Sequence, residues 1–205
     1  LGVHRLWKDA LIDWLNPQKK QTLLDVAGGT GDITNRFKKR GGGPAIVCDI
    51  NQQMLINGQK KFSDSIPMKD TIWICGDAEK LPIDDKSVDV YTIAFGLRNI
   101  TNIQIALEEA HRVLRPGGRF LCLEFSDFSI RFLKPLYEAY SFKIIPQIGN
   151  VVANDKGSYK YLVESIRQFP DQTQLISRMK EAGLEQCKFR NLSGGIAAIH
   201  SAWRI

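Results

Sequence analysis

The 205-residue sequence is poor in the residues from which metal centres and disulfide frameworks are built. It holds four cysteines and three histidines, and no two cysteines form a Cys-x-x-Cys pair. Cysteines that stand singly within strand-like runs indicate reduced core thiols in a reducing compartment. No apolar run approaches the roughly 18 residues that span a bilayer, and the first residues lack a signal-peptide layout. The sequence therefore predicts a protein without a metal, a disulfide or a transmembrane helix.

A strong charge of one sign is also missing. The formal net charge is +6, and the excess is spread along the chain without a basic tail. The basic cluster at residues 36–40 lies on the helix expected after the first strand and at its exit, where cations suit the negative end of the helix dipole. This distribution does not predict a nucleic-acid partner, whereas contact with an anionic membrane surface stays open.

The most informative motif is residues 23–32 (LLDVAGGTGD), an apolar strand that enters a glycine turn. Counting Gly-x-Gly-x-x-Gly from Gly29 places Thr34 where a dinucleotide turn has its third glycine. Asp25 and Asp32 add negative charge where a pyrophosphate would bind, which favours a ligand that carries positive charge. S-adenosylmethionine has a sulfonium and an ammonium but no phosphate. Asp32 has the alternative role of complementing the helix dipole.

Two more carboxylates follow predicted strands. Asp49 ends the run at 45–48 and lies 18 residues beyond Gly31, the spacing of an acid that accepts ribose hydroxyls. The alternative role for Asp49 is a helix N-cap. Asp77 follows the run at 71–75, a position that suits the amine of adenine, and the alternative there is an ordinary turn. The residues predicted to contact the methyl donor are Asp25, Ala27, Gly28, Gly29, Thr30, Gly31, Asp49, Ile50, Asp77, Ala78 and Ala94.

The order of predicted elements indicates the fold class. Strands and helices alternate with short connections, which is typical of a parallel sheet covered on both faces. After the first strand, further strands are expected at 45–48, 71–75, 88–95, 119–125, 186–192 and 196–204. The last two flank Ser-Gly-Gly and predict an antiparallel hairpin. We therefore expect a Rossmann-like α/β fold of the class I S-adenosylmethionine-dependent methyltransferases, with a mostly parallel seven-stranded sheet and an antiparallel last strand.

The chain is expected to form one domain over residues 1–205. A helix at the start presents one apolar face that includes Trp7, Leu11 and Trp14, and another helix at 103–114 ends at Pro116-Gly117. The alternation pauses for a helical insertion at about 128–170, before a helix at 171–182. We expect this insertion to cap the substrate.

Several segments carry a family resemblance. They are LLDVAGGTGD at 23–32, DIN at 49–51, GDAE at 76–79, FGLRN at 95–99, HRVLRPGG at 111–118, YSF at 140–142, VAND at 152–155, YKYLVESIR at 159–167 and GGIAAIH at 194–200. In this order they resemble the ubiquinone/menaquinone biosynthesis C-methyltransferases of the UbiE type, which include the mitochondrial coenzyme Q counterpart. The glycine turn marks only the superfamily, whereas the segments at 95–99 and 159–167 are far more specific. Family sequence that precedes Gly2 is missing here, so the N-terminal part of the substrate lid is expected to be absent.

The resemblance implies methylation of a ring carbon on a polyprenylated benzoquinol or on demethylmenaquinol. Such a carbon becomes nucleophilic when a neighbouring hydroxyl loses its proton, and the ring loses a second proton after methylation. Arg98 can stabilise a phenolate or orient a water, since its high pKa disfavours it as the base. Asn99 can bond the substrate or the methionine moiety, and Asp127 can accept a proton. The expected catalytic residues are Arg98, Asn99 and Asp127, and the expected substrate-binding residues are His4, Phe95 and Tyr140.

Alternatives remain for some of these residues and for the function. Asp127 can be a plain loop carboxylate, His4 a solvent-facing residue at a helix start, and Tyr140 a packing residue. The resemblance leaves open a homodimer, a quinone-biosynthesis complex and transient contact with a membrane surface. It implies a cytoplasmic or peripheral inner-membrane location in a bacterium, and the matrix side of the inner membrane in a mitochondrion. Another small-molecule or RNA methyltransferase and a non-catalytic scaffold are the competing functions.

Overall fold

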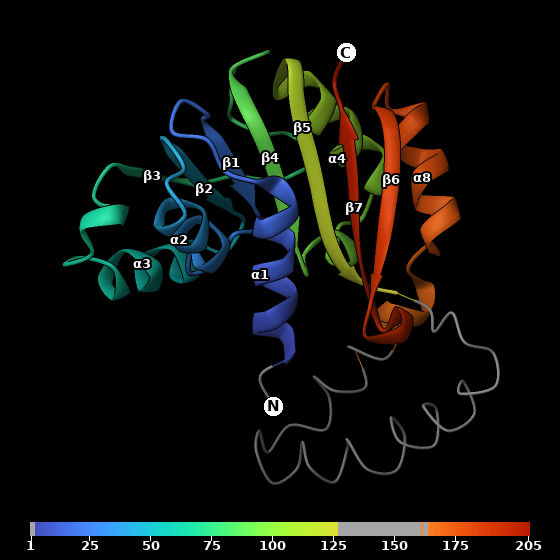
Figure 1. Cartoon of the computed structure of the whole chain (residues 1–205), viewed down its shortest axis with the longest axis horizontal. Helices are drawn as coiled ribbons and strands as arrows, with labels where there is room; N and C mark the ends of the chain where they lie inside the picture. The colour runs from blue at the N-terminus through green and yellow to red at the C-terminus, as the bar shows by residue number, and fades with distance from the viewer. Residues whose placement is uncertain (1–2, 127–160, 162–163) are drawn as a thin grey trace, which may run out of the picture.

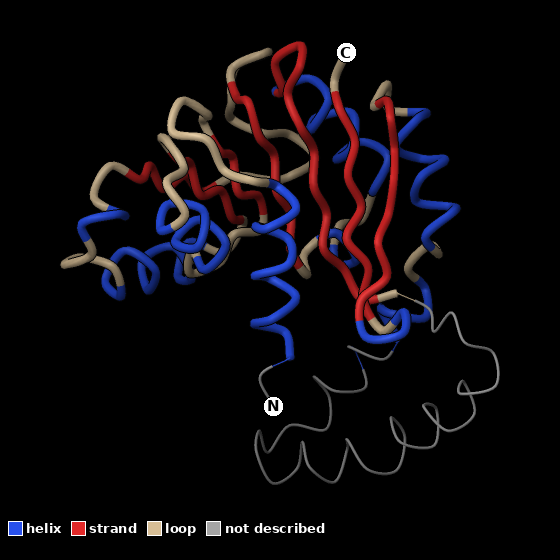
Figure 2. Tube along the Cα trace, viewed as in Figure 1, coloured by secondary structure: helices blue, strands red, loops and turns tan. Residues whose placement is uncertain are grey.

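A seven-stranded sheet organises the computed structural model, which describes residues 3–126, 161 and 164–205 (Figures 1 and 2). The strands are β1 (Leu23–Val26), β2 (Ala45–Asp49), β3 (Thr71–Cys75), β4 (Val88–Ala94), β5 (Leu114–Phe125), β6 (Glu185–Leu192) and β7 (Ala197–Trp203). Their order is β3-β2-β1-β4-β5-β7-β6, and β7 runs antiparallel to both neighbours while the other pairs are parallel. The predicted sheet with an antiparallel last strand is confirmed.

Helices cover both faces of the sheet (Figure 1). The helices are α1 (Val3–Leu15), α2 (Asp32–Lys39), α3 (Gln52–Lys61), α4 (Ile103–Val113) and α8 (Gln172–Glu181), with short 3₁₀ turns η1 (Ile66–Met68), η2 (Leu97–Asn99) and η3 (Ser193–Gly195). Local sequence explains several helix starts: Asn51 and Asn102 accept hydrogen bonds from the third backbone N–H that follows each of them, and Asp171 forms a capping box with Gln174.

Two hydrophobic clusters lie on opposite faces of the sheet. Leu121 and Leu123 of β5 join the cluster that holds Leu11 of α1, whereas Phe120 and Cys122 join the cluster that contains buried residues of α4 and α8. Successive residues of a strand point to opposite faces. A strand that is apolar at every position is therefore covered on both sides, as the alternation of strands and helices predicted.

Among the described strands, the start of β5 is the boundary that differs from the sequence-based expectation by more than one residue. The strand predicted at 119–125 begins five residues earlier, because the Pro-Gly-Gly turn is joined to the end of β7. Gly117 N donates to the Arg204 carbonyl and Arg204 N donates to the Gly118 carbonyl. Val3 of the opening helix is 47% exposed, so the buried stripe of α1 begins at Trp7.

The insertion expected at about 128–170 lies mostly outside the described residues, as do Asp127 and Tyr140. Near the end of this expected insertion, Tyr161 and residues 164–168 are described as helical. Within the described parts of the chain, no helix combines the length and apolar character needed to cross a membrane.

A buried histidine in β7 gives the fold a pH dependence. His200 is 1% exposed, and burial lowers its pKa from the usual 6.5 to about 4. The folded state therefore favours the neutral ring, and this contribution to stability is present above pH 6.5 and lost as the pH falls through 4. We expect the unfolding free energy of the wild type to fall by about 3 kcal/mol relative to His200→Leu between pH 6.5 and 4.

Urea denaturation of both proteins at several pH values measures this difference. Comparing the two proteins cancels the carboxylates that they share, including those that titrate in the same range. A difference in unfolding free energy that does not change with pH would contradict the assignment of a buried neutral ring at position 200.

Candidate functional site

A cavity of about 490 Å³ opens at the carboxyl ends of β1, β2, β3 and β4. Small-molecule sites commonly occupy about 300–1,000 Å³, and in open α/β sheets they lie at this edge, where the strand order reverses. Here the reversal falls between β1 and β4. The cavity is lined by Val26, Ala27, Gly29, Asp49, Ile50, Asn51, Met54, Gly76, Asp77, Ala78, Glu79, Phe95, Gly96, Asn99, Ile100 and Thr101.

The glycine turn between β1 and α2 forms one wall of this cavity. Ala27, Gly29 and Gly31 have φ values of 50°, 54° and 77°, in the left-handed region that glycine adopts most easily. A Cβ on Gly28 would lie 2.8 Å from both the Asp25 carbonyl oxygen and Val47 Cγ1. Glycines are therefore needed here both for backbone conformation and for the close approach of β1 to β2.

Glycine is required at position 31 for two reasons, its positive φ and the space that the Trp73 ring leaves. A Cβ on Gly31 would lie 2.7 Å from Cη2 of the Trp73 ring, whereas Gly41 has a similar φ of 81° and nothing within 4 Å. We expect Gly41→Ala to cost about 1 kcal/mol of unfolding free energy and Gly31→Ala about 2–4 kcal/mol, because only the second adds a steric clash. Chemical denaturation measures both, and equal costs would refute the proposed contact with Trp73.

Asp49 connects the end of β2 to the glycine turn. Its Oδ2 accepts a hydrogen bond from Gly29 N at 2.8 Å, and its Oδ1 accepts one from Asn51 N at 2.8 Å. These bonds fix the carboxylate on the cavity wall next to the start of α3. Carboxylate oxygens have further lone pairs, so the group can also accept the two hydroxyls of a ribose.

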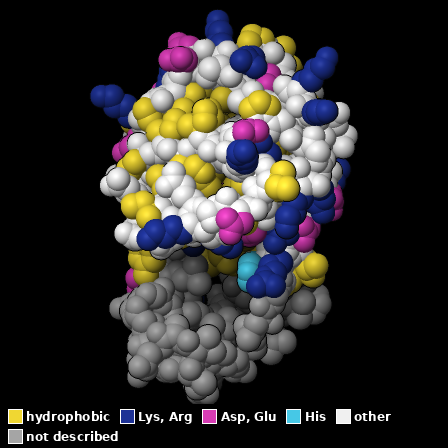
Figure 3. Space-filling model, turned by 90° about the vertical axis from the view of Figure 1, so that its left-hand side faces the viewer, with side chains coloured by type: hydrophobic (Ala, Val, Ile, Leu, Met, Phe, Trp, Pro, Cys, Tyr) yellow, Lys and Arg dark blue, Asp and Glu magenta, His cyan; other side chains and the backbone are white. Residues whose placement is uncertain are grey.

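Asp77 and its neighbours form the opposite side of the cavity. Asp77 Oδ1 accepts from Glu79 N at 2.9 Å, and Asn102 N donates to Glu79 Oε1 at 2.9 Å. Ile50 contributes an apolar surface that is 73% exposed, which suits the face of a planar base. The β3 and α3 side of the molecule carries exposed hydrophobic side chains among charges of both signs (Figure 3).

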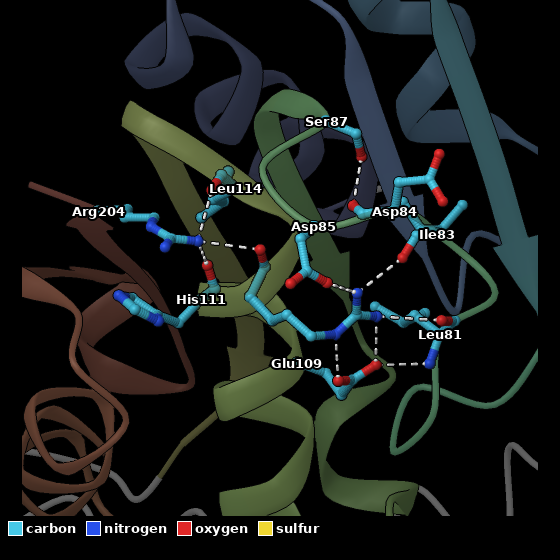
Figure 4. A network of polar contacts seen from close by, with 10 residues as sticks. Leu81, Ile83, Asp84, Asp85, Ser87, Glu109, His111, Leu114 and Arg204 are labelled. Carbon is cyan, nitrogen blue, oxygen red and sulfur yellow. Dashed lines mark hydrogen bonds and ion pairs between the residues drawn. The ribbon is translucent and has the colours of Figure 1, made fainter.

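A polar network on α4 holds the chain that follows Asp77 (Figure 4). Arg112 donates to the carbonyl oxygens of Leu81 and Ile83 at 3.1 and 2.8 Å. Its partner Glu109 accepts from Leu81 N at 2.7 Å, and hydrogen bonding to Arg112 lowers the pKa of Glu109. The HRVLRPGG segment, quoted above only for its resemblance, therefore anchors the loop that presents Asp77 and Ala78.

The structure corrects the expected placement of two acids. Asp25 is fully buried and accepts hydrogen bonds from Thr34 and Thr92, so it holds the turn from below and does not line the cavity. Burial raises the pKa of Asp25 to about 6, against the effect of these bonds. Asp32 forms ion pairs with Lys8 and Arg36. Arg36 lies four residues after Asp32 on the same face of α2. Thr92 and Lys8 are distant in sequence and are brought to these carboxylates only by the tertiary arrangement.

The cavity nevertheless has the negative character that those acids were expected to supply. Among its lining residues, Asp49, Asp77 and Glu79 are acidic and none is basic. A pyrophosphate would face carboxylates here without a compensating cation, whereas a sulfonium and an ammonium are favoured. The residues present therefore fit S-adenosylmethionine.

The cavity brings together many of the predicted residues but not all. Ala27, Gly29, Asp49, Ile50, Asp77 and Ala78 line it, as do Phe95 and Asn99. Gly28, Thr30, Gly31 and Ala94 belong to the same turn and strand end but are not lining residues. The lining residues that were not among the predicted site residues are Val26, Asn51, Met54, Gly76, Glu79, Gly96, Ile100 and Thr101. Asn51 is the N-cap of α3 and Met54 lies three residues further on, so the helix start predicted just after Asp49 was the signal that could have found both.

The segment after β4 connects the cavity to an aromatic cluster. Phe95 lines the cavity with a φ of 59°, and its ring lies 4.9 Å from that of Phe125 and 6.3 Å from that of Trp7. Arg98 does not line this cavity; its Nη1 donates to Glu124 Oε1 at 2.7 Å. His4 is exposed in the first turn of α1, one turn before Trp7.

This sheet order, with the cavity at the switch point, is the fold of the class I S-adenosylmethionine-dependent methyltransferases. A solved S-adenosylmethionine-dependent methyltransferase from Aquifex aeolicus superposes with a TM-score of 0.71 at 16% identity, over 98% of this chain and 93% of that one. The [4+2]-cyclase SpnF superposes with a TM-score of 0.73 at 17% identity, over 98% and 81%. At these identities the likeness shows the fold, which hosts more than one reaction.

Sequence comparison identifies the family. The model of the ubiE/COQ5 methyltransferase family matches residues 1–204. The chain is 54% identical to the ubiquinone/menaquinone biosynthesis C-methyltransferase UbiE of Cereibacter sphaeroides, and 53% identical to that of Paracoccus denitrificans; each match spans 100% of the chain and 82% of the relative. The chain belongs to the ubiE/COQ5 methyltransferase family. It is an S-adenosylmethionine-dependent C-methyltransferase, and the predicted family, fold class and methyl donor are confirmed.

Proposed function

We propose that the protein methylates a ring carbon of a polyprenylated benzoquinol, of demethylmenaquinol, or of both. The observation that carries the proposal is the acidic donor cavity, which borders directly on the family-specific segment FGLRN through Phe95, Gly96 and Asn99. The names of the relatives, which assign them to ubiquinone and menaquinone biosynthesis, support the quinol as the acceptor.

The chain's own residues bind and orient the donor. When bound, S-adenosylmethionine supplies an electrophilic methyl group, and the transfer requires alignment with the acceptor carbon and exclusion of water. In our proposal Asp49 accepts the ribose hydroxyls and Asp77 accepts the adenine amine. Ile50 and Ala78 pack against the base, while Ala27 and Gly29 bring backbone close to the methionine end.

Arg98 is proposed to stabilise the phenolate form of the substrate through charge-assisted hydrogen bonds. Its side chain is 11% exposed, and Nη1 is engaged by Glu124 and the Phe95 carbonyl. Nε is buried and has no hydrogen-bond partner among the described residues. The neighbouring Asn99 lines the cavity and accepts a hydrogen bond from Tyr161 at 3.1 Å.

Other expectations are carried forward as proposals. Asp127 is proposed as a proton acceptor, with His4, Phe95 and Tyr140 in contact with the substrate and the insertion at about 128–170 as its cap. We propose that residues 1–205 form one domain. A lipophilic acceptor resides in a membrane, so the proposed location is the inner-membrane surface, on the cytoplasmic side in a bacterium or on the matrix side in a mitochondrion. We propose transient membrane contact, and the homodimer and the quinone-biosynthesis complex are further partners to test.

A methyl-transfer assay in detergent under reducing conditions tests the function. We expect transfer to demethylmenaquinol, to the demethyl benzoquinol, or to both, with one methyl added per ring. Isothermal titration with S-adenosylmethionine runs in parallel. Donor binding without transfer to either quinol would overturn the substrate assignment, and the absence of donor binding would favour a non-catalytic scaffold.

A further inference from the structure

We propose that Glu124 is a positioning residue for methyl transfer, which holds the Arg98 guanidinium in place at the carboxyl edge of the sheet. The proposal rests on the role of Arg98 proposed above and adds a residue that neither the motifs nor the cavity had singled out. Glu124 lies near the end of β5 and is 1% exposed, so it acts on the reaction through Arg98 and not by touching the donor cavity.

Two of the three hydrogen bonds that Glu124 accepts come from Arg98. Its Oε1 accepts from Arg98 Nη1 at 2.7 Å and from Phe125 N at 2.9 Å, and its Oε2 accepts from Arg98 N at 3.3 Å. Arg98 Nη1 also donates to the Phe95 carbonyl at 2.8 Å. The same carboxylate thus holds both the backbone and the side chain of Arg98, and it ties the turn η2 to the end of β5.

The ring of Phe125 also contacts the Arg98 guanidinium. The Arg98 guanidinium carbon lies 5.3 Å from the centre of the Phe125 ring, within the range of a cation–π contact. A guanidinium is planar and its five donors form a rigid fork. Once Nη1 and one face are fixed, the direction of every other N–H is fixed as well. Nε is one such donor, buried and without a partner among the described residues.

The fold alone gives no reason to retain this pair. Replacing a buried ion pair by well-packed apolar residues is often neutral or stabilising. Burial raises the pKa of Glu124. Arg98 and the backbone N–H groups of Arg98 and Phe125 lower it, but they offset only part of that rise. A carboxylate kept at this cost beside FGLRN is explained by the orientation that it imposes on Arg98.

Three variants test the inference: Glu124→Gln, Arg98→Gln and the double variant, with Glu108→Gln as control. Glu108 is an exposed glutamate of α4, and its variant should behave as wild type. We expect Glu124→Gln to lower kcat roughly 10- to 100-fold, since small misplacements of a reacting group cost this much, and to leave the Kd for S-adenosylmethionine within twofold. Because Glu124 acts through Arg98, the double variant should be no slower than Arg98→Gln alone.

The outcomes separate the two proposals. If the wild type turns over a quinol but Glu124→Gln keeps wild-type kcat, or if the two substitutions multiply in the double variant, the positioning role is overturned and the proposed function stands. If the wild type methylates neither quinol, the proposed function fails and the inference fails with it. The unfolding free energies of all four variants are measured as well. The double variant has glutamine at both positions 98 and 124 and therefore no unpaired buried charge, so it serves as a folded reference for the two single variants.

Discussion

Replacing Asp49 with alanine is expected to weaken the binding of S-adenosylmethionine roughly 100-fold, which is about 2.7 kcal/mol. The carboxylate faces the cavity and is held by Gly29 N and Asn51 N. Alanine removes the acceptor for the ribose hydroxyls, and it also frees Gly29 N and loosens the turn. Hydrogen bonds to charged groups contribute about 1.5–3 kcal/mol each, so the loss should be large.

Isothermal titration of the donor measures this effect. The matched control is Asp64→Ala, which removes an exposed carboxylate beyond the end of α3 and should leave donor affinity unchanged. Denaturation curves for both variants distinguish weaker binding from loss of the fold. A Kd for Asp49→Ala within threefold of the wild type would show that this carboxylate does not bind the ribose.

Replacing Arg98 with glutamine is expected to lower kcat about 10²- to 10³-fold with little change in the donor Kd. Removal of one preorganised group that stabilises developing negative charge costs about this much. Asp49 and Asp77 line the donor cavity and Arg98 does not, so binding and transfer should respond to different residues. Arg98→Ala is the less useful variant, because it removes the hydrogen-bond donor as well as the charge beside the buried Glu124, whereas the amide of glutamine can still donate to that carboxylate.

Single-turnover kinetics at saturating donor measure the chemical step. Arg115→Gln is the control, since Arg115 is 47% exposed and pairs with Asp89, at the start of β5 and far from its carboxyl end. Its kcat should stay near that of the wild type. An Arg98→Gln protein with unaltered kcat and KM would remove Arg98 from the mechanism and leave the assignment of the stabilising group open.

Local patterns were sufficient for the sheet and for two acids of the site. Runs such as 45–48 and 71–75 are apolar at nearly every position, and their strands differ from prediction by at most one residue. Asp49 and Asp77 follow these strands, and parallel strands bring their carboxyl ends to one edge. Their place in the cavity therefore follows from chain order alone.

Charges near the glycine turn were harder to interpret, because their partners are distant in sequence. Asp25 accepts from Thr92, which lies 67 residues away, and Asp32 pairs with Lys8 across the α1–α2 contact. These two carboxylates interact with protein partners and do not line the donor cavity. Sequence spacing predicts the position of a carboxylate on the backbone, but burial and hydrogen bonding determine whether its charge faces the ligand or another residue of the protein.

The sequence by itself determined the alternating fold, the glycine turn and the acids at the strand ends, since each depends on local conformation and on the order of elements. Only the tertiary structure decided which carboxylates face the methyl donor and which residue holds Arg98. Glu124 reads in the sequence as one position of an apolar strand, and it meets Arg98 only because β4 and β5 pair in parallel. Two groups 26 residues apart are thereby brought to hydrogen-bonding distance at one edge of the sheet.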